Sequence, residues 1–216
     1  MRRQTRLVVF DWDGTLMDST GQIVAAASGA IADLGLPTRS PEAIRDIIGL
    51  GLRESWHRLF PELGTEDFVP FVDAYRDHFL DPGKQTARLF DRAREVVEEL
   101  AGRGFLLAVA TGKSRRGLDR DLAATGLDRF MAGSRTADET RSKPNPDMLY
   151  ELMTGLAATP EATLMVGDTE WDLEMARRAD VAAVAVSYGA HTPERLRAFA
   201  PLACIDSLEA LPRLLE

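Results

Sequence analysis

The sequence predicts an α/β protein in which a doubly wound parallel sheet forms the core and a helical segment follows the first strand. Three observations lead to this prediction. Residues 7–10, Leu-Val-Val-Phe, form a short apolar run that is typical of a buried strand. Residues 20–80 show helical spacing of apolar side chains and no strand pattern. From residue 86 onward, apolar strands alternate with helices, as in sheets built from right-handed crossovers.

The inserted segment is predicted to contain four helices, separated by glycine and proline. The first of them is rich in alanine and ends at Gly35. Residues 81–84, Asp-Pro-Gly-Lys, are expected to form the turn that leads back to the core. The four predicted helices cover residues 23–36, 41–48, 52–60 and 65–80.

The remaining elements alternate along the chain. Strands are predicted at residues 105–110, 163–166 and 182–186, and helices at residues 91–101, 116–124, 147–156 and 173–178. Together with the first strand, they predict a Rossmann-like core of residues 1–16 and 86–216. The helical domain is then residues 17–85.

Composition restricts the possible functions. The chain has 216 residues, of which 45% are hydrophobic and 28% charged, with a formal net charge of −8. An acidic protein is poorly suited to sequence-independent nucleic-acid binding, which depends on Lys and Arg neutralising phosphates. No apolar stretch approaches the ~20 residues of a membrane span. The single cysteine, Cys204, excludes an intrachain disulfide, and a reducing cytoplasm is the expected location.

Polar residues follow three of the predicted strands. Asp11 and Asp13 come after the first, Thr111 and Gly112 end the second, and Asp168 ends the third. Since the carboxyl ends of parallel strands share one edge of a sheet, these residues are expected to converge there. Carboxylate oxygens at such an edge suit a hard cation such as Mg²⁺.

Four motifs complete this pattern: DWDGTLMDS at residues 11–19, ATGKS at 110–114, SKPNPD at 142–147 and GDTEWD at 167–172. In this order, across the whole chain, they resemble the haloacid dehalogenase-like superfamily of phosphohydrolases. The place of the insert resembles the helical-cap subgroup, which includes phosphoglycolate phosphatase-like enzymes. The resemblance implies that the first strand lies in the centre of the sheet.

The resemblance also implies roles for the acidic residues. Asp11 would be the nucleophile that forms an aspartyl-phosphate. Asp13 would protonate the leaving alcohol and later activate water. Asp11, the backbone carbonyl of Asp13, and Asp168 would hold Mg²⁺, with Asp172 orienting a ligand or a metal-bound water.

The other candidate residues would bind the substrate. The Thr111 hydroxyl and nearby amides, including the segment at Gly112, would hold phosphoryl oxygens, and Lys143 would compensate charge on Asp11 and the phosphoryl group. Arg53, in the helical domain, is a candidate for binding a substrate carboxylate or a second phosphate. The alternative is that Arg53 is a surface arginine without such a role. The family usually has glycine where Asp180 stands, and Asp tolerates the left-handed conformation expected there.

The expected reaction is hydrolysis of a small phosphorylated metabolite, without nucleic acid or membrane. Alternatives within the superfamily are an inorganic pyrophosphatase and a β-phosphoglucomutase-like mutase. The Gly-x-x-Arg signature of the mutases is not matched, because Leu50 stands three residues before Arg53. A non-enzymatic alternative is a phosphometabolite-binding protein, but no core motif residue is lost. The sequence does not indicate an oligomeric state or the particular substrate.

Overall fold

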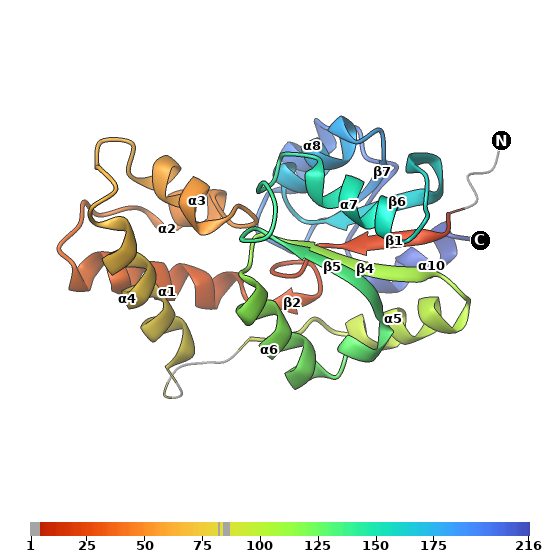
Figure 1. Ribbon diagram of the computed structural model, residues 1–216, viewed down its shortest axis with the longest axis horizontal. Helices are drawn as coiled ribbons and strands as arrows, with labels where there is room; N and C mark the ends of the chain where they lie inside the picture. The colour runs from red at the N-terminus through yellow and green to blue at the C-terminus, as the bar shows by residue number, and fades with distance from the viewer. Residues whose placement is uncertain (1–4, 82, 84–86) are drawn as a thin grey trace.

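A six-stranded parallel sheet forms the centre of the molecule (Figure 1), in a computed structural model that describes residues 5–81, 83 and 87–216. The strand order is β5-β4-β1-β6-β7-β8, so β1 lies inside the sheet, between β4 and β6. This confirms the predicted fold class. The strands are β1 (Leu7–Phe10), β4 (Leu106–Thr111), β5 (Met131–Thr136), β6 (Thr163–Gly167), β7 (Ala182–Val186) and β8 (Ala203–Ile205).

Both faces of the sheet are covered, which explains why β1 is apolar at every position. Val8 and Phe10 face one layer of helices, and Leu7 and Val9 face the other, as the two-residue period of a strand requires. Figure 1 shows α5 and α6 on one face and α7 and α8 on the other. The helices of the core are α5 (Ala93–Gly102), α6 (Arg115–Thr125), α7 (Asp147–Gly155), α8 (Glu170–Arg178), α9 (Pro193–Arg197) and α10 (Leu211–Leu214).

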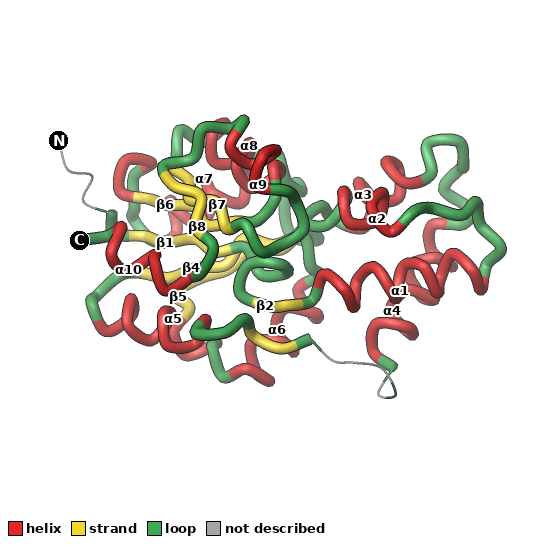
Figure 2. Tube along the Cα trace, turned by 180° about the vertical axis from the view of Figure 1, so that it is seen from behind, coloured by secondary structure: helices red, strands yellow, loops and turns green. Residues whose placement is uncertain are grey.

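The helical insert extends from the end of the sheet at which β1 finishes, as both views show (Figures 1 and 2). Its helices α1 and α4 pack side by side, and aromatic residues such as Trp56, Phe60 and Phe71 fill its own apolar core. The four helices are α1 (Thr20–Asp33), α2 (Pro41–Asp46), α3 (Leu52–Leu59) and α4 (Phe68–Leu80).

A two-residue antiparallel ladder joins the entry and exit of the insert. It consists of β2 (Met17–Asp18) and β3 (Arg88–Leu89), close to the predicted domain boundaries. The boundaries at residues 16/17 and 85/86 stay a prediction, and the predicted turn at 81–84 lies partly outside the described residues. Among the described helices, none has the length and apolar character needed to cross a membrane.

Some local features differ from the expectation, and one agrees with it. Strands β5 and β8, the edges of the sheet, were not predicted, because an edge strand is only partly buried and lacks a continuous apolar run. Helix α8 begins at Glu170 rather than at residue 173, because Thr169 and Asp172 form a capping box. Asp180 adopts φ +56°, the left-handed conformation expected where the family usually has glycine.

Candidate active site

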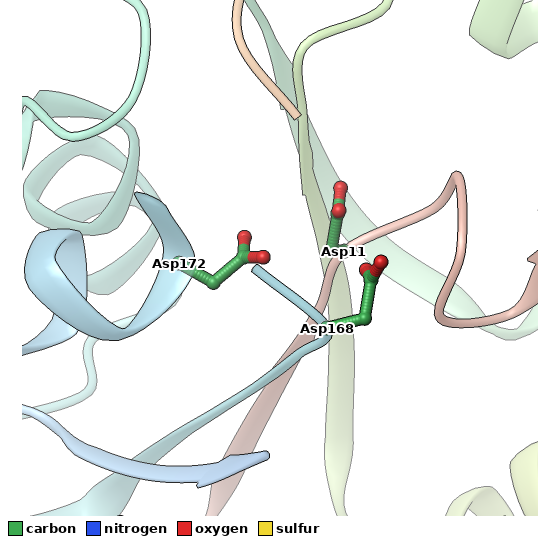
Figure 3. Close-up of side chains that lie close together, drawn as sticks. All are labelled: Asp11, Asp168 and Asp172. Atoms are coloured by element: carbon green, nitrogen blue, oxygen red, sulfur yellow. The ribbon is translucent and has the colours of Figure 1, made fainter. Parts of the chain in front are cut away.

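Three buried carboxylates meet at the carboxyl edge of the sheet (Figure 3). Asp11 follows β1, Asp168 follows β6, and Asp172 lies in the first turn of α8. One carboxylate oxygen from each lies within 4.8 Å of the others, and all three residues are inaccessible to solvent. The sheet order therefore brings together residues from strands that are far apart in sequence.

A buried lysine lies against this cluster. The Lys143 Nζ atom is 2.7 Å from Asp11 Oδ1 and 2.6 Å from Asp172 Oδ1. Burial by itself would lower the pKa of Lys143, but Asp11 and Asp172 together raise it above its ordinary value. The ammonium group is therefore protonated at neutral pH. Three carboxylates and one ammonium leave a formal charge of −2 in the cluster.

Burial, and to a lesser extent the negative charge of the cluster, raises the pKa values of two of the acids. Burial raises the pKa of Asp11 well above its ordinary value, against the opposing effect of Lys143. Burial, followed by the charge of Asp172, raises the pKa of Asp168 to about 7. Without a further positive charge, these carboxylates would resist full ionisation near neutral pH.

The donors at this edge fit a divalent cation. They are hard carboxylate oxygen atoms, and the three carboxylates together with Lys143 carry a net charge of −2. Asp168 is held in place by the Thr15 hydroxyl at 2.8 Å and the Ala190 amide at 2.7 Å. Gly14, at φ +86°, makes this approach possible, because a Cβ atom there would clash with Asp168.

Asp172 has a different environment. Its Oδ1 atom contacts Lys143, and its Oδ2 atom accepts hydrogen bonds from the Thr169 amide at 3.1 Å and the Thr169 hydroxyl at 2.6 Å. Both oxygen atoms are thus engaged by the protein. The role of Asp172 in orienting a ligand or a metal-bound water stays a prediction.

The Asp13 side chain is not part of the three-carboxylate cluster. Its Oδ1 atom accepts a hydrogen bond from the Ser19 hydroxyl at 2.6 Å and lies 3.0 Å from Lys113 Nζ. Lys113 also contacts Asp121 in α6, at 3.2 Å from Oδ2. Asp11 and Asp13 therefore lie in separate electrostatic environments, each with its own lysine.

The insert reaches the second and third motifs through the loop between α2 and α3. A Cβ atom at Gly112 would lie 2.5 Å from the Leu50 carbonyl oxygen and 2.6 Å from that of Gly49. The Gly51 amide donates a hydrogen bond to the Ser142 hydroxyl at 2.7 Å, next to Lys143. Thr111, which ends β4 and directly precedes Gly112, is buried.

Arg53 is not brought to the carboxylates. It is exposed near the start of α3, and its guanidinium lies 5.1 Å from the centre of the Phe68 ring, within the insert. Lys113, by contrast, was not among the residues singled out by the sequence. The available signal was its place directly after Thr111 and Gly112 in a chain with only three lysines.

Known proteins share this sequence pattern and fold. The family model described as haloacid dehalogenase-like hydrolase matches residues 8–186. A probable phosphatase, IndB of Dickeya dadantii, is 35% identical over 207 residues, which cover 93% of this chain and 89% of that protein. A phosphoglycolate phosphatase of Vibrio parahaemolyticus is 30% identical over 218 residues, or 97% of this chain and 96% of the relative.

A solved structure agrees with these sequence relatives. The crystal structure of a predicted phosphoglycolate phosphatase from Haemophilus somnus 129PT has a TM-score of 0.88 at 25% identity, over 99% of each chain. These similarities confirm the resemblance carried by the four motifs and the prediction of a phosphatase-class enzyme. The chain belongs to the haloacid dehalogenase-like hydrolases.

Proposed function

We propose that the protein is a Mg²⁺-dependent phosphomonoesterase that hydrolyses a small phosphorylated metabolite through an aspartyl-phosphate on Asp11. The observation that carries this proposal is the state of Asp11. Its carboxylate is buried at the carboxyl edge of the sheet and paired with Lys143 through Oδ1, and its Oδ2 atom has no hydrogen-bond partner among the residues that the structure describes. A carboxylate held in this way has one oxygen oriented by the protein and one free to attack phosphorus.

The first half-reaction uses Asp11 and Asp13. Asp11 Oδ2 attacks the phosphorus atom while Asp13 donates a proton to the departing ester oxygen. Lys143 balances charge on Asp11 and on the phosphoryl oxygens, and the Thr111 hydroxyl and neighbouring amides bind those oxygens. Asp11, Asp168 and the Asp13 carbonyl would hold Mg²⁺, which would supply further positive charge for the phosphoryl group. Thr15 and Ala190 fix the carboxylate of Asp168 for this role.

In the second half-reaction, Asp13 accepts a proton from water, which attacks the aspartyl-phosphate and releases inorganic phosphate. Asp11 is thereby regenerated. The protein's main contribution to both steps is positioning and electrostatic stabilisation, as in phosphoryl transfer generally. The Gly49–Leu50 backbone of the insert approaches Gly112 too closely for a Cβ atom there, so the insert lies directly against the second motif.

The phosphoglycolate phosphatase of Vibrio parahaemolyticus supports a small carboxylated phosphate ester as the substrate class. Inorganic pyrophosphate hydrolysis and phosphosugar isomerisation are the alternative reactions. The cytoplasmic location, the domain boundaries and a role for Arg53 with a substrate anion stay predictions.

A substrate panel tests the proposal. Purified protein is assayed for phosphate release from 2-phosphoglycolate, glycerol phosphate, pyrophosphate, glucose 1-phosphate and p-nitrophenyl phosphate, with Mg²⁺ and with EDTA, and kcat/KM is compared. We expect Mg²⁺-dependent hydrolysis of at least one alkyl phosphate. Asp11→Asn should lower turnover at least a thousandfold while leaving the circular dichroism spectrum unchanged, since it removes the nucleophile and little volume. Turnover of the variant within tenfold of wild type would refute the mechanism.

A further inference from the structure

Two pairs of acidic residues in this molecule are each bridged by one lysine. Lys143 bridges Asp11 and Asp172. Lys113 bridges Asp13 and Asp121 in the same manner, at 3.0 and 3.2 Å. In both cases one aspartate belongs to the first motif and the other to a helix that follows a neighbouring strand. The second bridge has no part in the mechanism described above.

The Lys113 bridge is nearly closed to solvent. The side chains of Lys113, Asp13 and Asp121 are only 10%, 10% and 13% exposed. The ring of Phe79, from α4 of the insert, covers the ammonium group, with its centre 4.9 Å from Nζ. Exclusion of water strengthens an ion pair and limits the conformations available to it.

Both contacts to Asp13 are made at a single oxygen atom. Lys113 and the Ser19 hydroxyl converge on Oδ1, at 3.0 and 2.6 Å. No hydrogen bond to Oδ2 is found within residues 5–81, 83 and 87–216. Engagement of one oxygen alone fixes the rotation of the carboxylate and leaves the other oxygen available for proton transfer.

Lys113 is poorly placed to act as a free cation for a substrate anion. Its charge is already balanced by Asp13 and Asp121, while Arg120 supplies a second positive charge to Asp121 at 2.7 Å. The group of two acids and two bases is formally neutral. This differs from the cluster around Asp11, where the formal charge of −2 leaves room for a cation.

We propose that Lys113 is a positioning residue: it clamps Oδ1 of Asp13 so that Oδ2 faces the leaving group and, later, the attacking water. Asp121 in turn holds Lys113, and Phe79 shields the pair. The inference rests on the proposed function, because it assigns a role only if Asp13 exchanges protons in the reaction.

The test compares two leaving groups in the first turnover. p-Nitrophenolate departs with little need for a proton, whereas an alkoxide requires one. Single-turnover rates are measured for p-nitrophenyl phosphate and for the alkyl phosphate that the panel shows to be hydrolysed fastest. For Lys113→Met we expect the rate with the alkyl phosphate to fall about 30-fold, and the rate with p-nitrophenyl phosphate to fall less than about threefold. The larger loss is part of the 10²–10⁴-fold that general acid catalysis typically contributes. Lys113→Arg should recover much of the loss.

Arg115→Met provides a matched control. Arg115 is a cation two residues further along, with two acidic partners, Asp119 at 3.1 Å and Glu139 at 2.6 Å, but without contact to Asp13. Loss of this cation should change the single-turnover rates with the two substrates by the same factor. If Lys113→Met fails to fold, Asp121→Asn replaces it in the test, because this variant keeps the lysine but removes one of its two ion pairs. Its rate with the alkyl phosphate should fall about fivefold more than its rate with p-nitrophenyl phosphate.

A double-mutant cycle with Asp13→Asn separates the inference from the proposed function. If Lys113 acts through Asp13, adding Lys113→Met to Asp13→Asn changes the alkyl phosphate rate less than about twofold. Equal losses for both leaving groups, or a full additional loss in the Asp13→Asn background, would overturn the positioning role. If Asp13→Asn itself shows no dependence on the leaving group, the proposed acid–base mechanism fails. If it does show this dependence and Lys113→Met does not, only the inference fails.

Discussion

The stability of the metal-free protein should fall as the pH rises from 5 to 8. One cause is Asp168, whose pKa is about 7 in the folded protein and 3.8 as the ordinary value, and Asp11, whose pKa burial also raises, acts in the same direction. Between these values the folded state binds a proton that the unfolded state has released, so raising the pH favours unfolding. The stabilisation that Asp168 contributes to the folded protein is fully present below pH 4 and is lost as the pH rises through 7.

The size of the effect follows from the shift. A shift of about three pKa units corresponds to about 4 kcal/mol in the free energy of unfolding. About 3 kcal/mol of this is lost between pH 5 and pH 8. For a chain of this length, each kcal/mol moves Tm by about 2–4 °C. His191 opposes the trend, because burial lowers its pKa and its folded state binds fewer protons near pH 6. The expected net decrease in Tm is about 5–10 °C.

Thermal unfolding in EDTA, followed by circular dichroism at pH 5, 6, 7 and 8, measures this decrease. Parallel samples contain Mg²⁺ in excess. Because protons and cation compete for the same carboxylates, Mg²⁺ should raise Tm more at pH 8 than at pH 5. Asp168→Asn should weaken the pH dependence and the Mg²⁺ effect together, with the raised pKa of Asp11 accounting for the pH dependence that stays. A metal-free Tm that is constant or rises from pH 5 to 8 would refute the charge analysis of the site.

Three further substitutions test separate parts of the molecule. Asp13→Ala should release p-nitrophenolate in a burst of at most about one equivalent per enzyme and then turn over slowly, with phosphate trapped on Asp11, because no base activates water. Steady turnover of alkyl phosphates at the wild-type rate would exclude Asp13 as the acid–base residue. Gly112→Ala should lower kcat/KM about tenfold by displacing the Gly49–Leu50 backbone; unchanged kinetics would show that this contact is not needed for turnover. Arg53→Ala should raise KM for the best alkyl phosphate more than for p-nitrophenyl phosphate; equal effects would identify a surface arginine.

Much of the fold follows from local sequence. Strand β1 is buried on both faces, so its four residues are all apolar and the run is visible without any tertiary information. The helices of the insert were predicted from spacing and from glycine and proline, with ends displaced by a few residues. The edge strands β5 and β8 were missed, because their partly exposed side chains are not held to an apolar pattern.

The residues of the candidate site that lie at the ends of strands were predictable from the sequence. Asp11, Thr111 and Asp168 come directly after or at the end of inner strands, and all parallel strands of a sheet finish at the same edge. For this reason the sequence by itself determined the fold class, the edge of the sheet at which the candidate site lies and the nature of the acids there. Lys143 belonged to the same prediction only through its motif, because it lies on a loop.

Side-chain partners were decided only by the tertiary structure. Lys113 and Asp13 are 100 positions apart, and their ion pair depends on the path of the chain after β4 and on the position of α6. The separation of Asp11 and Asp13 into two electrostatic environments has the same origin, since each depends on a different lysine. Periodicity reports which side of an element is buried, but a contact between distant elements is set by sheet order and helix packing, and these depend on the whole chain.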